Sequence, residues 1–305
     1  MGASGRLLVT GACGFVGRHL VEAADKWGYE AFGVGRCPHN NRVPGITYFD
    51  CDIRDELSMV DVFNDVKPHV VSHQAGTASV AQARENPNEA VSVNVTGTSV
   101  VAALCKLHNA QLLLASTHAV YGNLGKDGTP FKETDPTNPQ STYAASKLAA
   151  ELIVRAAGLN RSVILRYGNV YGAGQRHGLF PAIINASLSG EPLRLSSPLN
   201  STRDYIHIDD LVQRHFAFLC GPYFVPGTIF NVGSGIARTL GDVLDVASLF
   251  AQFTTVSDHG LIGDAVKHTA LNVSQLELNG LWRTATVNFA LTVKATLNQE
   301  AATCV

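Results

Sequence analysis

Residues 6–20 read RLLVTGACGFVGRHL, and this stretch decides the fold of the first half of the chain. Residues 6–10 form a short apolar run typical of a buried strand, and a helical pattern follows over residues 18–27. The three glycines between them, spaced GxxGxxG, permit a tight turn, a close approach of the backbone and close packing of the helix. A strand, a glycine turn and a helix in this order predict a dinucleotide-binding unit, with phosphates at the helix N-terminus.

Strand and helix patterns alternate as far as about residue 166. The further strands that we expect cover residues 29–34, 46–49, 69–73, 111–116 and 161–166. Helical patterns cover residues 55–66, 89–108 and 141–158. Repeated βα units of this length predict an α/β fold, a doubly wound parallel (Rossmann) sheet, with ligands bound beyond the carboxyl ends of the strands.

The pattern loosens after residue 167, where glycines and prolines interrupt short helices and strands. We therefore expect a dinucleotide-binding Rossmann domain over residues 1–167. A smaller, discontinuous, mostly substrate-binding lobe is expected over residues 168–305, with about 203–235 returning to the Rossmann sheet. After about residue 255 the signal is too weak to assign elements.

The composition restricts the class of function. The chain has 305 residues, of which 46% are apolar and 16% are charged, and its formal net charge is -2. A charged share below the usual quarter fits a compact enzyme. Because there is no basic cluster, we expect neither nucleic-acid nor anionic-membrane binding. No uninterrupted apolar stretch reaches 18 residues, so we expect a cytoplasmic protein without a signal peptide or membrane span.

The cysteines show no metal-binding pattern. They are scattered along the chain as Cys13, Cys37, Cys51, Cys105, Cys220 and Cys304. No Cys or His spacing indicates zinc, and we expect no metal. Positions within strand and helix patterns favour reduced, buried thiols. Cys13 lies in the glycine turn and could contact a cofactor, but a small filler is the favoured interpretation.

Tyr143 and Lys147 stand four residues apart in the helical pattern STYAASKLAAE, so both side chains leave the same face of a helix. An ammonium beside a phenol favours the phenolate and would lower the pKa of Tyr143 toward neutrality. The pair could then exchange a proton with a substrate hydroxyl while hydride moves to a dinucleotide. Tyr-x-x-x-Lys alone is common on ordinary helices, but here a glycine turn and a strand ending in Ser-Thr precede it.

Several motifs agree in order and distance. They are VTGACGFVGRHL at 9–20, DIRD at 52–55, NVTGT at 94–98, STHAVYG at 116–122, YAASK at 143–147, RYGNVYGAGQR at 166–176, RDYIHIDDL at 203–211 and FNVGSG at 230–235. With them the sequence resembles the extended short-chain dehydrogenase/reductase family, in its nucleotide-sugar epimerase/dehydratase branch.

The resemblance implies catalytic roles for Tyr143, Lys147 and Thr117. The residues that we expect at the cofactor are Gly11, Gly14, Phe15, Val16, Gly17, Arg36, Asp52, Ile53, Ala75, Asn94, Tyr143 and Lys147. The residues that we expect at a nucleotide-diphosphate sugar are Thr117, His118, Asn169, Arg176 and Arg203. Three of these have plainer alternatives: Arg203 could pair with Asp204 at the surface, Asn169 could satisfy loop backbone, and His118 could be a solvated loop histidine or an additional acid/base.

The chain departs from the family pattern at three places. Dehydratases of this branch carry Thr-Asp-Glu where this chain has Thr117-His118-Ala119, which makes dehydration a minor hypothesis. NAD-binding members usually place an Asp after the second strand, whereas this chain has Arg36, with Arg42 nearby. A guanidinium without a carboxylate favours the 2′-phosphate of NADP, although Arg36 could instead stack on the adenine of NAD. Relatives also carry an Arg before the Gly-Asp of residues 263–264, where Lys267 or Arg176 could compensate.

These features predict an NAD(P)-dependent nucleotide-sugar 4-epimerase that oxidises a sugar hydroxyl transiently to a ketone. The alternative is an NADPH-dependent reductase of a nucleotide 4-keto-6-deoxysugar. The minor alternatives are a nucleotide-sugar dehydratase and a non-catalytic protein that senses dinucleotide. The resemblance also implies a homodimer, formed through the helices at residues 89–108 and 141–158.

Overall fold

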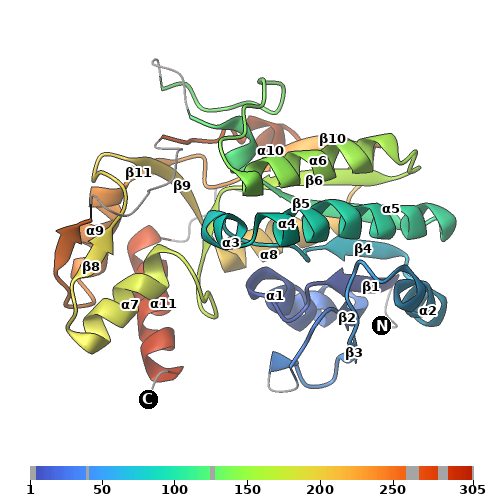
Figure 1. Ribbon diagram of the computed structural model, residues 1–305, viewed down its shortest axis with the longest axis horizontal. Coiled ribbons are helices and arrows are strands. Elements are labelled where there is room, and N and C mark those ends of the chain that lie inside the picture. Colours follow the sequence, from blue (N-terminus) through green and yellow to red (C-terminus); the bar gives the residue numbers. More distant parts are fainter. Residues whose placement is uncertain (1–4, 39–40, 124–127, 259–267, 281–287, 304–305) are drawn as a thin grey trace. The chain divides into compact units, whose positions relative to one another are not determined.

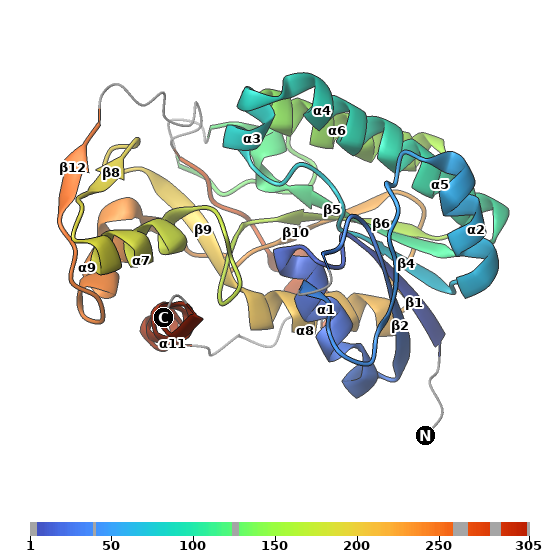
Figure 2. The ribbon, with the colours of Figure 1, turned by 60° about the horizontal axis from the view of Figure 1, so that its bottom comes forward.

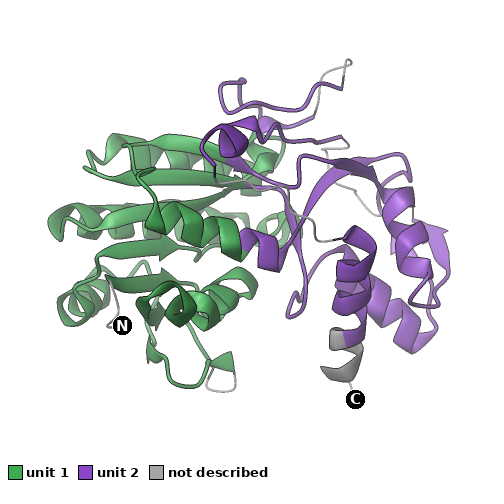
Figure 3. Ribbon diagram, turned by 180° about the vertical axis from the view of Figure 1, so that it is seen from behind, with its two compact units in different colours: residues 1–120, 139–166, 212–230 green, residues 121–138, 167–211, 231–305 purple. Residues whose placement is uncertain are grey.

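The computed structural model of the protein describes residues 5–38, 41–123, 128–258, 268–280 and 288–303. The chain divides into two compact units, each built from three separate segments (Figure 3). The first unit contains residues 1–120, 139–166 and 212–230. The second unit contains residues 121–138, 167–211 and 231–305.

A seven-stranded sheet forms the centre of the first unit, in the order β10-β6-β5-β4-β1-β2-β3 (Figure 1). Its strands are β1 (Gly5–Thr10), β2 (Tyr29–Val34), β3 (Thr47–Phe49), β4 (Val70–His73), β5 (Gln111–Thr117), β6 (Ser162–Tyr167) and β10 (Thr228–Val232). β1 pairs in parallel with β2 and β4, as do β2 with β3 and β4 with β5. The order β3-β2-β1-β4-β5-β6 is that of the doubly wound dinucleotide-binding fold, which confirms the predicted fold class.

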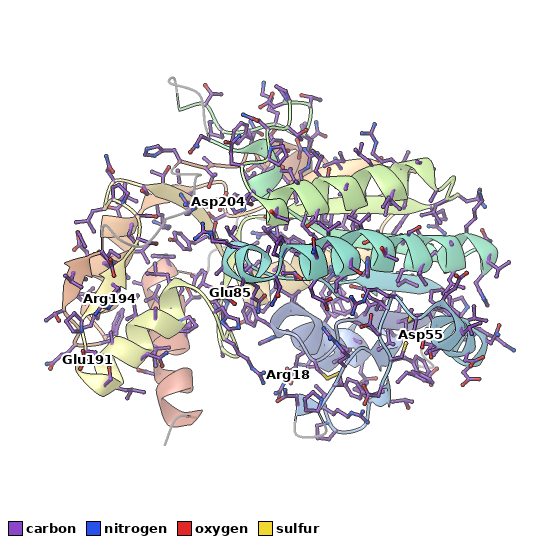
Figure 4. The ribbon with its side chains drawn as sticks, viewed as in Figure 1. Arg18, Asp55, Glu85, Glu191, Arg194 and Asp204 are labelled. Carbon is purple, nitrogen blue, oxygen red and sulfur yellow. A yellow bond between two sulfur atoms is a disulfide. The ribbon has the colours of Figure 1, made fainter. Side chains whose placement is uncertain are left out.

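Helices cover both faces of this sheet (Figure 2). They are α1 (Phe15–Ala23), α2 (Glu56–Val66), α3 (Val80–Glu85), α4 (Pro87–Val91), α5 (Thr98–Leu107), α6 (Thr142–Ala156) and α8 (Ile208–Cys220), with a 3₁₀ turn η1 (Ala24–Trp27) after α1. A core cluster joins apolar residues of α2, α5 and α6 to Leu8, Leu112 and Ile164 of the strands. Asp55, labelled in Figure 4, caps α2 by accepting a hydrogen bond from the Ser58 amide.

The helix expected over residues 89–108 is interrupted. A π-helical turn, η3 (Ser92–Gly97), separates α4 from α5. By length and composition alone Pro87–Leu107 could cross a membrane, with a mean hydropathy of 1.4, but half of its apolar window is buried inside the protein. A core helix of a soluble protein passes the same test, so this finding is weak evidence for a membrane span.

The described residues of the second unit form two small sheets. In the three-stranded sheet, β9 (Thr202–His207) pairs in parallel with β7 (Asn169–Tyr171) and antiparallel with β11 (Ala237–Thr239). In the other, β8 (Leu193–Leu195) pairs with β12 (Thr255–Ser257). Among the described residues of this unit, the helices are α7 (Leu179–Ser189), α9 (Leu240–Ser248), α10 (Ser274–Leu278), α11 (Phe289–Thr303) and the first residues of α8 (Figure 1). Residues 203–235 were expected to return to the Rossmann sheet. Of the strands in this segment, β10 lies at the edge of the seven-stranded sheet, whereas β9 belongs to the three-stranded sheet.

Candidate active site and cofactor site

The glycine turn has room for backbone only. Gly11 follows β1 with φ +67°, and a Cβ atom there would lie 2.8 Å from the backbone of Ala75. A Cβ atom on Gly17 would overlap the carbonyl oxygen of Gly11, and the Gly14 amide donates to the same oxygen at 2.9 Å. Gly17 therefore lets helix α1 pack closely on the end of β1, and Gly11 lets the turn approach the segment that follows β4.

Helix α1 begins at this turn without a side-chain cap. Gly14 is its N-cap residue and, having no side chain, makes no capping hydrogen bond. The amides of the first turn belong to Phe15, Val16 and Gly17, and the positive end of the helix dipole lies there. This uncapped helix start beside a side-chain-free turn fits the pyrophosphate of a dinucleotide.

Arg36 lies just beyond β2 and is largely exposed, with 70% of its side chain accessible. Its Nη1 atom lies 4.0 Å from Oε1 of Glu89, and Arg54 binds the other oxygen of Glu89 at 2.8 Å. Arg42 donates to the Cys37 carbonyl at 3.3 Å. Three guanidinium groups therefore belong to the region that follows β2 and β3, where the ribose of a dinucleotide lies in this fold.

Asp52 and Ile53 follow β3 and are held by protein contacts. Both carboxylate oxygens of Asp52 accept from Arg54, at 2.9 and 2.7 Å. These hydrogen bonds lower the pKa of Asp52 to about 2, with a further lowering by the charge of Arg36. Ile53 is buried, and its side chain occupies the space that a Cβ atom on Gly97 would need.

Asn94 is buried in the π-helical turn and connects two elements. Its Oδ1 atom accepts from the Thr77 amide at 2.9 Å, and its Nδ2 atom donates to Ser146 of α6 at 2.8 Å. Ser146 in turn donates to the Tyr143 carbonyl at 2.8 Å. These contacts support the first turn of α6, so Asn94 acts on the site through that helix, and its contact with a cofactor stays a prediction.

Thr117, Tyr143 and Lys147 come together in the first unit. Thr117 ends β5, and its side chain is hydrogen-bonded to the Tyr143 hydroxyl. Helix α6 is capped by Ser141, which accepts from the Ala144 amide at 3.2 Å, so Tyr143 lies in its first turn and Lys147 one turn later. The tyrosine is half-buried and the lysine is buried.

Burial dominates the pKa values of both groups. It raises the pKa of Tyr143, and the hydrogen bond with Thr117 opposes this only in part. Burial also lowers the pKa of Lys147 to about 8, against the opposing charge of Glu151. The expected lowering of the Tyr143 pKa is therefore wrong for the protein alone, because the loss of hydration outweighs the hydrogen bond with Thr117.

A buried ion pair beneath helix α6 was missed from the sequence. Arg166 of β6 donates to both carboxylate oxygens of Glu151, at 3.0 and 2.7 Å, and Ser116 of β5 also donates to this carboxylate. All three residues are buried. The network attaches α6 to two strands and provides the negative charge that acts on Lys147. Its signal is a glutamate one turn after Lys147, on the helix face that also carries Ala150 and Val154.

His118 follows Thr117 in a 3₁₀ turn, η4 (His118–Tyr121), and is half-buried. The Ala119 amide donates to Oγ1 of Thr117 at 3.2 Å, which fixes the start of this turn. Both hypotheses for His118, a loop histidine or an additional acid/base, remain predictions.

Three expected substrate residues lie in the second unit. Asn169 begins β7, and its buried Oδ1 atom has no hydrogen-bond partner among the residues that the structure describes. Arg203 of β9 is partly exposed and donates to the Thr202 carbonyl at 2.9 Å. Its neighbour Asp204, labelled in Figure 4, is buried and accepts from the Ser234 and Gly235 amides.

Arg176 is exposed in the loop after β7. The third departure from the family pattern concerns residues 261–264 and Lys267. These residues lie outside the part of the chain that the structure describes.

A disulfide corrects the expectation of reduced cysteines. Cys13 of the glycine turn is bonded to Cys37, with their Cα atoms 5.6 Å apart. Cys105 is buried as expected, whereas the Cys51 thiol is partly exposed and the Cys220 thiol is exposed; Cys304 lies outside the described residues. The pairing of β1 with β2 provides the physical reason.

In that register Thr10 of β1 lies opposite Val34 of β2. Cys13 is three residues beyond Thr10 and Cys37 is three residues beyond Val34, so the two cysteines leave the sheet side by side. The sequence separation of 24 residues gave no sign of this proximity.

Comparisons with known proteins agree with this geometry. The model of the NAD dependent epimerase/dehydratase family matches residues 7–233. A UDP-glucose 4-epimerase of Mycoplasma genitalium is 30% identical over 280 residues, which cover 81% of this chain and 82% of the relative.

Two crystal structures have the same fold. The first is the UDP-glucose 4-epimerase of Thermus thermophilus in complex with NAD. Its sequence is 30% identical and its TM-score is 0.85, and the match covers 96% of this chain and 98% of the Thermus chain. The second is the UDP-glucose 4-epimerase of Thermotoga maritima with UDP-glucose. Its sequence is 25% identical and its TM-score is 0.88, and the match covers 98% of this chain and 100% of the Thermotoga chain. The chain belongs to the NAD dependent epimerase/dehydratase family, enzymes of the extended short-chain dehydrogenase/reductase type, as the sequence motifs implied.

Proposed function

We propose that the protein is a nucleotide-sugar 4-epimerase that uses NAD or NADP and acts through a transient 4-keto sugar. The observation that carries this proposal is the Tyr143 hydroxyl bonded to Thr117, with buried Lys147 one helical turn away in the same unit as the glycine turn. The chemistry that a bound NAD or NADP supplies is reversible hydride transfer.

Each residue of the triad has a defined task. Tyr143 takes the proton from the sugar hydroxyl through its phenolic oxygen and later returns it. Thr117 holds the reacting oxygen by a hydrogen bond in line with Tyr143. Lys147 in its charged form favours the phenolate and offsets part of the cost of burying it. Because a ketone that presents its other face can be reduced again, epimerisation needs no further acid or base.

The substrate is a nucleotide-diphosphate sugar. We assign Arg203 to the diphosphate, because a guanidinium binds two phosphate oxygens at once. Asn169 brings a buried amide oxygen without a partner among the described residues, and this oxygen can accept a hydrogen bond from a sugar hydroxyl. Arg176 and His118 complete the proposed set. The related crystal structure with UDP-glucose supports this class of substrate.

The region after β2 favours NADP over NAD. It presents the exposed guanidinium of Arg36 and holds Arg42 through the Cys37 carbonyl. Residues 35–38 contain no carboxylate to accept from the ribose hydroxyls. The crystal structure of the Thermus relative contains NAD, so NAD stays the alternative cofactor. A preference for NADP would favour the second candidate function, reduction of a nucleotide 4-keto-6-deoxysugar by external NADPH.

The remaining assignments follow from the family. We assign residues 1–167 mainly to the cofactor and residues 168–305 mainly to the substrate. A homodimer through α4, α5 and α6 would cover the exposed side chains of Val91, Leu107 and Leu152. A cytoplasmic location fits the soluble nucleotide sugars that such an enzyme uses.

One experiment separates the two candidate functions. The purified protein is incubated with UDP-glucose or dTDP-glucose and NAD or NADP, and in a second reaction with a nucleotide 4-keto-6-deoxysugar and NADPH, and the sugars are identified by NMR. Interconversion of the 4-epimers without net change in cofactor supports the epimerase. NADPH consumption with a 4-keto-6-deoxysugar, and no epimerisation, would replace it by the reductase. Tyr143→Phe is the control, and equal activity of this variant would contradict both candidates.

A further inference from the structure

We propose that Cys13 and Cys37 form a redox site that controls cofactor binding: glutathione disulfide or a protein disulfide joins them, and the joined form binds dinucleotide weakly. This inference rests on the proposed function because it takes the glycine turn as the dinucleotide site. The structure contains the joined form.

The bridge joins the two loops that a dinucleotide must contact together. Cys13 lies inside the glycine turn, two residues before α1 begins, and Cys37 follows Arg36 directly. The loops are already adjacent, because the Gly11 amide donates to the Val34 carbonyl at 2.8 Å. The disulfide therefore spans the gap between the expected pyrophosphate turn and the guanidinium expected at the ribose.

The adenosine ribose occupies this same gap in the doubly wound fold. Its phosphate lies at the helix start, and its 2′-oxygen reaches the residue at the end of β2. A cystine across the gap fixes the loops 5.6 Å apart at their Cα atoms and fills space between them. The bridge and the ribose therefore compete, whereas two thiols can rotate apart and admit the ribose.

The bond can be opened from outside. Cys37 is buried, with 4% of its surface exposed, whereas Cys13 is partly exposed. An external thiolate therefore attacks the sulfur of Cys13, the disulfide bond breaks, and the Cys37 thiolate leaves and takes up a proton. A second external thiol then releases Cys13 from the mixed disulfide.

With glutathione the balance is one protein disulfide plus two glutathione thiols, giving two cysteine thiols and one glutathione disulfide. Oxidation of the protein is the reverse of this exchange. The positive end of α1 lies beside Cys13, and such a position favours the thiolate that the reverse step needs. In a reducing compartment a disulfide at a ligand site is characteristically a sensing or catalytic one.

The test measures dinucleotide binding in two redox states of the full chain. The protein is equilibrated with reduced or with oxidised glutathione, its cysteine pairing is mapped by peptide mass spectrometry, and NAD and NADP are titrated by calorimetry. We expect the dissociation constant to rise at least about tenfold in the form joined at Cys13 and Cys37, because one lost hydrogen bond to a charged group has this effect.

Two variants locate the effect. Cys37→Ser cannot form the bridge and should bind dinucleotide equally in both buffers. Cys220→Ser removes an exposed thiol that is not part of the pair and should keep the full response. Equal affinity of the joined and reduced wild-type forms would overturn the proposal, as would failure of oxidised glutathione to join the two cysteines. If the reduced protein bound no dinucleotide at all, the proposed function would fail together with this inference.

Discussion

The Nδ1 atom of His73 lies 2.7 Å from Oγ1 of Thr10, the last residue before the glycine turn. The other ring nitrogen lies 3.0 Å from Oγ1 of Thr98, whose hydroxyl donates to the Asn94 carbonyl at 2.6 Å. Thr98 must therefore accept from Nε2–H, which leaves Nδ1 to accept from Thr10. A neutral histidine thus connects the glycine turn to the π-helical turn.

The buried histidines predict a loss of stability toward acid. Burial lowers the pKa of both His73 and His215 to about 3, below the 6.5 of an unfolded chain. Unfolding therefore takes up protons when the pH is below 6.5, and stability falls as the pH falls toward 3. We expect each histidine to contribute about 1.4 kcal/mol per pH unit in this range.

Urea unfolding at pH 7, 6 and 5 measures how the free energy of unfolding changes with pH. These pH values lie above the range in which Asp52 titrates, so its carboxylate does not contribute to the slope. His73→Gln should remove about half of the slope and His215→Gln the other half. A free energy of unfolding that does not change between pH 7 and 5 would contradict the neutral, buried state of both rings.

Tyr143→Phe tests the proposed proton transfer. The change removes only the hydroxyl that is bonded to Thr117, so the ring keeps its packing on α6. We expect the turnover number to fall by at least about two orders of magnitude, the usual effect of losing a positioned acid/base. The measurement is kcat with the best nucleotide sugar. Tyr223→Phe, outside the proposed site, is the matched control and should keep its turnover.

The fold could be predicted because its signals are local. The strand pattern over residues 29–34 that became β2 and the helical pattern over residues 55–66 that became α2 were visible in stretches of about ten residues. The turn between β1 and α1 also carries its own signal, since Gly11 and Gly17 leave no space for a side chain. Motifs in a fixed order then connected these pieces to a family and to a reaction.

The missed features all depend on pairing between distant segments. The bond between Cys13 and Cys37 requires the register of β1 against β2. The partner of Glu151 lies on β6, 15 residues further along the chain. The raised pKa of Tyr143 depends on how much water the surrounding helices and strands exclude. None of these three features can be found by inspecting a short stretch of the sequence.

Arg36→Ala tests the cofactor preference. The guanidinium is exposed, and its ion pair with Glu89 is a long contact of 4.0 Å, so its removal should leave the fold intact. We expect the dissociation constant of NADP to rise about tenfold or more, because a hydrogen-bonded charge pair with the 2′-phosphate is lost, while that of NAD changes little. Calorimetric titration of both cofactors measures the difference. An equal loss for both would exclude a 2′-phosphate contact.

Glu151→Gln tests the ion pair beneath helix α6. The change leaves the buried guanidinium of Arg166 without its carboxylate, and we expect the free energy of unfolding to fall by about 3–5 kcal/mol. Glu22→Gln breaks an exposed pair with Arg18 on α1 and should cost less than about 1 kcal/mol. Urea unfolding compares the two variants at pH 7. Equal losses would mean that solvent screens both pairs alike, and the pair of Glu151 with Arg166 would then add no more to stability than a surface pair.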